Sequence, residues 1–319
     1  MSGNPLVSVI VPCKELDGYA RECIEHCKRL GYENYEVVLL PDRPLSKDLG
    51  NVKVVPTGPV TPGAKRNIGV ANSKGDICAF IDSDAYPRVD WLRNAVMYFN
   101  DPGVGVVGGP GLTPQNDSIL QKASGYVTSS LMVGGLSRRY KPGKLKEVDD
   151  IHSCNFMARR SVIKEAGGWN ERYWPGEDTL MCLAIKKAGF KIVQTSDVVV
   201  YHHRRPLFTD HLLQVSRFGL HRGFFAREFG GNSLHLTYFA PSIALMMLVL
   251  FSVLSTFVEV VTYLVVVALG SYLAASLFST LLETRDRRVV PVVWAGIMLT
   301  HLTYGAYFIA GLIKHELRK

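Results

Sequence analysis

The chain has 319 residues, of which 47% are hydrophobic and 20% are charged, and its formal net charge is +8. This length allows one large domain or two small ones. The positive charge suits a protein that handles phosphates beside an anionic membrane surface. The sequence contains no recognisable nucleic-acid-binding module and no interleaved basic and aromatic pattern, which argues against a nucleic acid partner.

The first 230 residues alternate between short apolar runs and helical patterns, so we expect a mainly parallel sheet covered on both faces. In chain order, the pattern predicts strands at 7–11, 36–40, 52–55, 77–81, 104–109, 156–158 and 192–200. It predicts helices at 18–30, 65–72 and 178–187. Pro12 is expected to stop the first strand.

The N-terminal apolar run is too short for an export signal, so we expect the first 230 residues to stay in the cytosol. The six cysteines all lie in this part, and none forms a CxxC pair. We therefore expect all six to be reduced thiols.

Acidic side chains follow two of the predicted strands. Asp42 follows strand 36–40, while Asp82 and Asp84 follow strand 77–81. Ligands of open parallel sheets bind outside the carboxyl ends of the strands. Two carboxylates one residue apart could bind Mg²⁺ or Mn²⁺, although such a triplet is also typical of a solvated turn.

Two later segments can likewise be interpreted either as ordinary structural features or as parts of a functional site. Glu177 and Asp178 begin a predicted helix, where acids favour the helix dipole but could also take a proton from an attacking hydroxyl. His202 and Arg204 follow an apolar run and could bind a metal or a diphosphate, or could form a basic strand end at a membrane.

The order of these segments is more specific than any one of them. Taken together, the stretches at 7–12, 36–42, 66–67, 82–84, 155, 167–169, 177–178 and 202 resemble the family-2 glycosyltransferases, which have the GT-A fold. The resemblance covers roughly residues 6 to 205. It implies a nucleotide-sugar donor and a divalent metal.

The resemblance also implies roles for individual residues. Asp178 would be the general base, with Glu177 shaping the acceptor site, and Asp84 and His202 would hold Mn²⁺ or Mg²⁺. The donor-binding residues would be Pro12, Glu15, Asp42, Arg66, Asp82 and Arg204. The acceptor-binding residues would be Asn155, Trp174, Gln214 and Arg217. Gln214 and Arg217 also resemble the QxxRW motif of membrane-bound polysaccharide synthases, with Phe218 in place of Trp.

Two segments depart from the family pattern. The first loop has Lys14-Glu15 where the family usually has Asn before Glu, and the second strand ends in Pro41-Asp42-Arg43-Pro44 instead of Asp-Asp-Gly-Ser. Because these loops recognise the base, the sequence leaves UDP-, GDP- and dTDP-linked donors open.

The C-terminal part predicts membrane attachment. Segments 238–258, 260–282 and 290–313 contain no charged residue, and each is about as long as the roughly 20 residues that a membrane-crossing helix needs. Segment 209–229 predicts a basic amphipathic helix suited to the membrane interface. We therefore expect a catalytic domain at 1–205, an interface region at 206–235 and a transmembrane region at 236–319.

The charges between these segments conflict with three simple crossings. The arginine-rich loop 283–288 favours the cytosol by the positive-inside rule, but the basic tail 314–319 would then lie outside. The last segment could re-enter the membrane instead of crossing it.

The combined prediction is an inverting, metal-dependent glycosyltransferase of the cytoplasmic membrane that is multi-pass and has its catalytic domain in the cytosol. The acceptor would be a hydroxyl of a lipid-linked or growing glycan, because a sugar hydroxyl needs a base and a phosphate does not. The alternatives are a polyprenyl-phosphate glycosyltransferase and a processive polysaccharide synthase. A nucleotidyltransferase would usually have a glycine-rich loop after its first strand, and a scaffold would not need three acidic sites.

Overall fold

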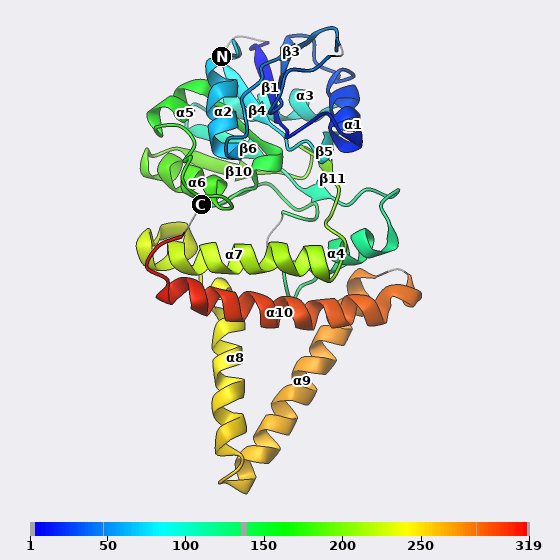
Figure 1. Ribbon diagram of the computed structural model, residues 1–319, viewed down its shortest axis with the longest axis vertical. Helices are drawn as coiled ribbons and strands as arrows, with labels where there is room; N and C mark the ends of the chain where they lie inside the picture. The colour runs from blue at the N-terminus through cyan, green and yellow to red at the C-terminus, as the bar shows by residue number, and fades with distance from the viewer. Residues whose placement is uncertain (1–3, 47, 135–138, 285, 318–319) are drawn as a thin grey trace. The chain divides into compact units, whose positions relative to one another are not determined.

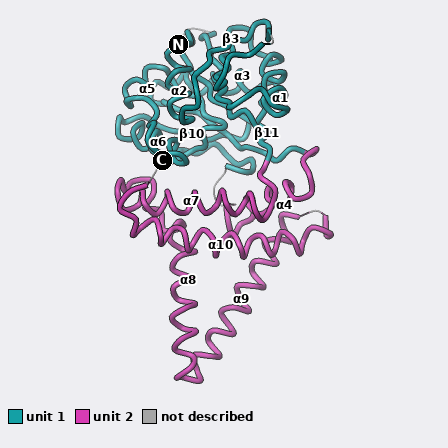
Figure 2. Tube along the Cα trace, viewed as in Figure 1, with its two compact units in different colours: residues 1–114, 138–203, 319 teal, residues 115–137, 204–318 magenta. Residues whose placement is uncertain are grey.

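The computed structural model describes residues 4–46, 48–134, 139–284 and 286–317 (Figure 1). These residues divide into two compact units (Figure 2). The first contains the described residues up to Pro114 and from 139 to His203, and the second contains 115–134 and those from Arg204 onward. The sequence-based domain limits stay a prediction. The chain changes from the first unit to the second after His203, close to the predicted limit at residue 205. Residues 115–134, however, belong to the second unit with the C-terminal part.

The first unit is built on an eight-stranded sheet in the order β3-β2-β1-β4-β9-β6-β10-β8. Its strands are β1 (Val7–Pro12), β2 (Tyr35–Leu40), β3 (Val52–Val54), β4 (Ile77–Phe80), β6 (Val104–Gly108), β8 (Lys146–Glu147), β9 (Phe156–Arg159) and β10 (Lys191–Gln194). Strands β1 to β4 pair in parallel, as does β6 with β10. Strand β9 runs antiparallel to both β4 and β6, and β8 runs antiparallel to β10. The other pairs are parallel, and the predicted mainly parallel sheet is confirmed.

Helices cover the sheet on both faces. They are α1 (Gly18–Cys27), α2 (Pro62–Ala71), α3 (Trp91–Val96), α5 (Arg160–Glu165) and α6 (Glu177–Lys187), with short 3-10 turns η1 (Met97–Asn100) and η2 (Ser153–Asn155). Alternate residues of β1 belong to different hydrophobic clusters, because Val9 packs with α1 and α3 whereas Ile10 packs on the other face. Such strands, buried on both faces, need the continuous apolar runs seen in the sequence.

A second sheet of three strands lies next to the site residues. It is composed of β5 (Ala85–Pro87), β11 (Val200–His202) and β7 (Gly111–Leu112) in the order β5-β11-β7. The single strand predicted at 192–200 is therefore wrong, since β10 and β11 belong to different sheets. The chain turns between them where Asp197 and Thr195 hydrogen-bond each other and the Tyr98 hydroxyl. Pro12 is the last residue of β1 and not the residue after it.

The second unit consists of helices. These are α4 (Ile119–Ser129), α7 (Thr209–Glu228), η3 (Gly231–Ser233), α8 (Leu236–Leu254), α9 (Glu259–Glu283), η4 (Arg287–Val289) and α10 (Val290–Ile313). Three of its helical segments, Gly231–Leu254, Glu259–Glu283 and Arg287–Ile313, are long and apolar enough to cross a membrane. A small core of α4, α10 and Leu207 holds the unit together.

Candidate active site

The carboxyl ends of β1, β2 and β4 bring the predicted acids to one edge of the large sheet. The register pairs Pro12 with Leu40 and Ile10 with Phe80, so the loops that follow these strands begin side by side. Asp42 follows β2, and Asp82 follows β4. This is the edge at which ligands of open parallel sheets bind.

Lys65 is a site residue that the sequence analysis missed. Its buried ammonium donates to the Asp42 carboxylate at 2.5 Å, to the backbone oxygen of Cys13 at 2.8 Å and to the Thr57 hydroxyl at 2.8 Å. Asp42 is thereby held in place at the end of β2. The available signal was the adjacent Lys65-Arg66 pair in a helix that opens toward this edge.

Arg66 connects two acidic sites that are far apart in the sequence. Its guanidinium donates to Glu177 at 2.6 Å and to Asp82 at 2.8 Å, and it also reaches the Ser153 hydroxyl at 2.8 Å. Burial alone would lower the pKa of Arg66, but the carboxylates of Asp82 and Glu177 outweigh burial and raise it. The guanidinium also lies over the Trp169 ring at 4.9 Å. One buried cation thus joins the end of β4 to the start of α6.

Glu177 and Asp178 form the first turn of α6 and have different environments. Glu177 is buried against Arg66, whereas Asp178 is half-buried. Burial, with the nearby charges of Glu177 and Asp150, raises the pKa of Asp178 to about 7. A carboxyl group with this pKa can accept a proton near neutral pH. Asp150, which the sequence analysis missed, is itself paired with Arg139 at 2.9 Å.

Asp84, in the turn before β5, and His202, at the end of β11, come together. His202 pairs with Ala85 across these strands, and its Nε2 lies 3.2 Å from the Asp84 carboxylate. Burial alone would lower the pKa of His202, but the Asp84 carboxylate outweighs burial and raises it to about 10. The neighbouring His203, also missed, bonds Glu22 at 2.9 Å and stacks on Tyr19.

The acidic edge fits a divalent cation only in part. Among the described residues, no group of three His, Cys, Asp or Glu side chains is arranged to hold a metal. Mg²⁺ is commonly bound through one or two carboxylates together with substrate phosphates, so a full set of protein ligands is not required. Asp84 and His202 face each other with an oxygen and a nitrogen, and a cation shared between them would displace the proton that His202 holds beside Asp84.

Two predicted acceptor residues have contrasting surroundings. Asn155 is buried, and its amide oxygen accepts from the Trp91 indole at 2.8 Å while its amide nitrogen donates to the backbone oxygen of Val198 at 2.8 Å. These bonds use the amide internally, so the structure gives Asn155 a structural role between β9 and the turn before β11. Trp174, in contrast, is 54% exposed and stands three residues before the start of α6.

The remaining predicted residues fall into two groups. Pro12 and Glu15 lie at and just after the end of β1, where Pro12 is buried and Glu15 is exposed. Arg204, Gln214 and Arg217 belong to the second unit, so their roles remain predictions. Within that unit, the backbone N–H of Arg204 donates to Asp117 at 3.3 Å.

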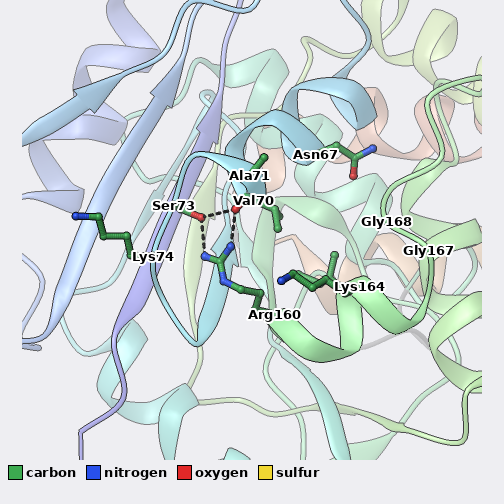
Figure 3. A pocket seen from close by; sticks show the side chains of 10 residues that line it. Asn67, Val70, Ala71, Ser73, Lys74, Arg160, Lys164, Gly167 and Gly168 are labelled. Atoms are coloured by element: carbon green, nitrogen blue, oxygen red, sulfur yellow. Dashed lines mark hydrogen bonds between the residues drawn. The ribbon is translucent and has the colours of Figure 1, made fainter.

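A hollow of about 680 Å³ lies away from these acids, between α2, α5 and the turn at Gly167 and Gly168 (Figure 3). Figure 3 shows the Arg160 guanidinium turned toward the backbone of Val70 and the hydroxyl of Ser73. None of the predicted site residues lines this hollow. Because none of these residues reaches it, we do not assign this hollow as the active site.

The site is thus a sheet edge with acids on neighbouring strands, which Arg66 joins to the carboxylate pair at the start of α6. The model of the family described as glycosyl transferase family 2 matches residues 8–167. The chain belongs to this family of glycosyltransferases.

Comparison with solved structures confirms the predicted GT-A fold. A mannosyltransferase from Pyrobaculum calidifontis, solved in complex with GDP-Man and Mn²⁺, matches with a TM-score of 0.64 at 17% identity, covering 99% of this chain and 89% of that chain. GalNAc-T7, solved with UDP, GalNAc and Mn²⁺, matches with a TM-score of 0.50 at 16% identity over 64% of this chain and 45% of that chain.

Curated relatives differ in how much of the chain they match. A pre-mycofactocin glycosyltransferase of Mycobacterium tuberculosis is 29% identical over 50% of this chain. The chain spans a third or less of the length of the first curated relatives that it matches. A dolichyl N-acetyl-alpha-D-glucosaminyl phosphate 3-beta-D-2,3-diacetamido-2,3-dideoxy-beta-D-glucuronosyltransferase of Methanococcus voltae is 22% identical, and the match covers 97% of both chains.

Proposed function

We propose that this glycosyltransferase moves a sugar, with inversion, from a nucleotide-sugar to a hydroxyl of a lipid-linked or growing glycan at the cytosolic face of a membrane. The observation that carries the proposal is the arrangement of Arg66, which joins the acidic edge at Asp82 to the carboxylate pair of α6. One rigid connection of this kind sets the distance between a bound donor and a base, which is the condition for an efficient displacement.

In the proposed reaction, the acceptor hydroxyl attacks the anomeric carbon on the face opposite the leaving group. The bond from that carbon to the diphosphate oxygen breaks, and the hydroxyl proton passes to the Asp178 carboxylate. One displacement by one nucleophile inverts the anomeric configuration. The raised pKa of Asp178, about 7, makes it a stronger base than an ordinary aspartate.

The other site residues act on the donor side. Lys65 fixes Asp42, which would contact the nucleotide base, and Arg66 fixes Asp82, which would lie near the ribose or phosphates. Asp84 and His202 would hold Mn²⁺ or Mg²⁺. Such a cation, when bound, neutralises the charge that gathers on the leaving diphosphate. The Mn²⁺ in both solved relatives supports this assignment.

A lipid-borne acceptor is supported by two observations. Three helices of the second unit are long and apolar enough for a membrane, and the relative from Methanococcus voltae that matches nearly the whole chain is named for a dolichyl-linked sugar phosphate. Because the nucleotides of the solved relatives differ, the proposal leaves UDP-, GDP- and dTDP-linked donors open.

The variant Asp178→Asn tests the role of the base. We expect its transfer to a hydroxyl acceptor to fall by about 10²- to 10⁴-fold, the usual contribution of a general base. Asp76→Asn is a matched control, since Asp76 is exposed and precedes the same strand that Asp82 follows. Near-normal turnover of Asp178→Asn with a polyprenyl phosphate would instead support that acceptor, because a phosphate is already anionic.

A product analysis tests the stereochemistry and the number of additions. We expect a single added sugar whose anomeric configuration is opposite to that in the donor. Retention of configuration would contradict the displacement, and a long polymer would identify a processive synthase.

A further inference from the structure

Helix α10 passes across the open end of the hairpin formed by α8 and α9. The hairpin turns between Leu254 and Glu259, so the start of α8 and the end of α9 are its two open ends. Figure 1 shows α8 and α9 extending away from α10, and not alongside it. The contacts of α10 agree with this arrangement.

The contacts between α10 and α8 are made at the start of α8. The ring of Phe308 lies 4.8 Å from that of Phe239, and the Ser242 hydroxyl donates to the backbone oxygen of Gly305 at 3.0 Å. These two residues of α8 belong to its first two turns. The second half of α10 therefore lies beside the open end of α8.

The contacts between α10 and α9 are made in the second half of α9. The Trp294 indole donates to the Ser276 hydroxyl at 2.9 Å, and the Tyr272 hydroxyl lies 2.8 Å from the His301 ring nitrogen. The first half of α10 thus lies beside the open end of α9. If the hairpin crosses a membrane and returns, both of its open ends lie at the same face, and α10 reaches from one of them to the other.

Helix α10 also packs along α7 in the same chain direction. His211 near the start of α7 contacts Thr300 at 2.9 Å, whereas Arg227 near its end donates to the backbone oxygen of Leu312 at 3.0 Å. The two helices approach closely, because a side chain at Gly223 would collide with the backbone of Phe308. In the apolar stretch of α10 that is long enough to cross a membrane, 33% is buried by the rest of the protein, against 6% in the corresponding stretches of α8 and α9.

From these contacts we infer that α10 lies in the plane of the membrane surface beside α7, and that α8 and α9 alone cross. The side of this helix pair that faces the bilayer then contacts the headgroup region. Residues 314–317, after α10, lie on the same side as α7 and as the catalytic unit, which ends one peptide bond before Arg204. The inference does not depend on the proposed reaction.

The charges of the second unit agree with this arrangement. Exposed cationic side chains lie on α7 at Arg217, before α10 at Arg287 and after α10 at Lys314. Three crossings would place Lys314 opposite the other two, against the positive-inside tendency. With α10 in the plane, all three cations lie at one face. The hairpin also has sufficient length, because the 19 residues of α8 span about 28 Å, close to a hydrocarbon core of about 30 Å.

Cysteine labelling in sealed vesicles tests the inference on the full chain. The variants are His315→Cys after α10, Thr256→Cys at the hairpin turn and Arg29→Cys as an exposed reference in the catalytic unit. The six native cysteines are all buried, so the parent protein measures the background. Each variant reacts with a membrane-impermeant maleimide before and after the vesicles are opened with detergent.

We expect His315→Cys to label in the same vesicles as Arg29→Cys, either intact or only after detergent. Thr256→Cys should show the reverse: it labels only after detergent if the other two label in intact vesicles, and in intact vesicles if they do not. If His315→Cys follows Thr256→Cys, α10 crosses the membrane and the inference is wrong. If all three variants label together, the hairpin does not cross, and the inference is equally wrong. Neither of these outcomes bears on the reaction, which the Asp178→Asn assay tests separately.

Discussion

At the residue scale, the titration of Asp178 sets an expected pH dependence. Burial and nearby carboxylates raise its pKa to about 7, and the base must be ionised to act. The rate with a hydroxyl acceptor should therefore rise with pH through about 7, since the carboxyl is protonated below that value. Rates measured from pH 5.5 to 8.5 check this. A rate that does not change across this range would show that Asp178 does not titrate in the rate-determining step.

The ion pairs of Arg66 lead to a second prediction at this scale, which concerns the stability of the fold. Replacing it in Arg66→Met leaves the buried carboxylate of Glu177 without its partner, which typically costs about 3–5 kcal/mol in the free energy of unfolding. Lys28→Met is a matched control, because the exposed pair of Lys28 and Glu25 should contribute no more than about 1 kcal/mol. Denaturant unfolding measures both variants. Equal losses would show that the connection through Arg66 is not important for stability.

The individual site residues also show how far the sequence could predict the site. Asp42, Asp82 and Asp84 were predictable because an apolar strand precedes each acidic segment and parallel strands end at one edge. Ser153 was not, because no local pattern specifies how η2 packs against the sheet, and Lys65 was missed although it stands next to the predicted Arg66 in α2. Asn155 matched a family position, but only the structure reveals the core hydrogen bonds of its amide.

At the element scale, the close approach of α7 and α10 depends on glycine. A larger side chain at Gly223 would collide with the backbone of Phe308, which cannot move without displacing α10. Gly223→Leu should therefore separate the two helices and lower the melting temperature of the detergent-solubilised protein. Gly270→Leu is a control, since nothing lies near a side chain at that position of α9. An equal melting temperature for both variants would contradict the close packing.

The elements themselves were predicted well where hydrophobic periodicity is strong and less well where a turn interrupts an apolar run. Strands β1, β2 and β4 and helices α6 to α10 lie near their predicted positions. The run at 192–200 divides into β10 and β11 because Thr195 and Asp197 bond Tyr98. No periodicity distinguishes α10, which lies along α7, from the hairpin helices, because each of the three contains a long uncharged run.

At the scale of the whole molecule, the chain combines a GT-A domain of glycosyl transferase family 2 with a helical unit that has three helices long and apolar enough to cross a membrane. The order of the chemical segments in the sequence was enough to predict the family. The nucleotide could not be predicted, because the loops after β1 and β2 depart from the family pattern at Lys14-Glu15 and Pro41–Pro44. The donor is therefore the first property to establish by experiment.

The most direct measurement is metal-dependent binding and slow hydrolysis of UDP-, GDP- and dTDP-sugars by the purified full chain, with Mn²⁺ and with a chelator. We expect at least one nucleotide-sugar to bind with Mn²⁺, the chelator to abolish binding, and Asp84→Asn to weaken it while Asp76→Asn does not. Binding of no nucleotide-sugar in the presence of Mn²⁺ would contradict the proposal that this chain is a metal-dependent transferase using a nucleotide-sugar donor.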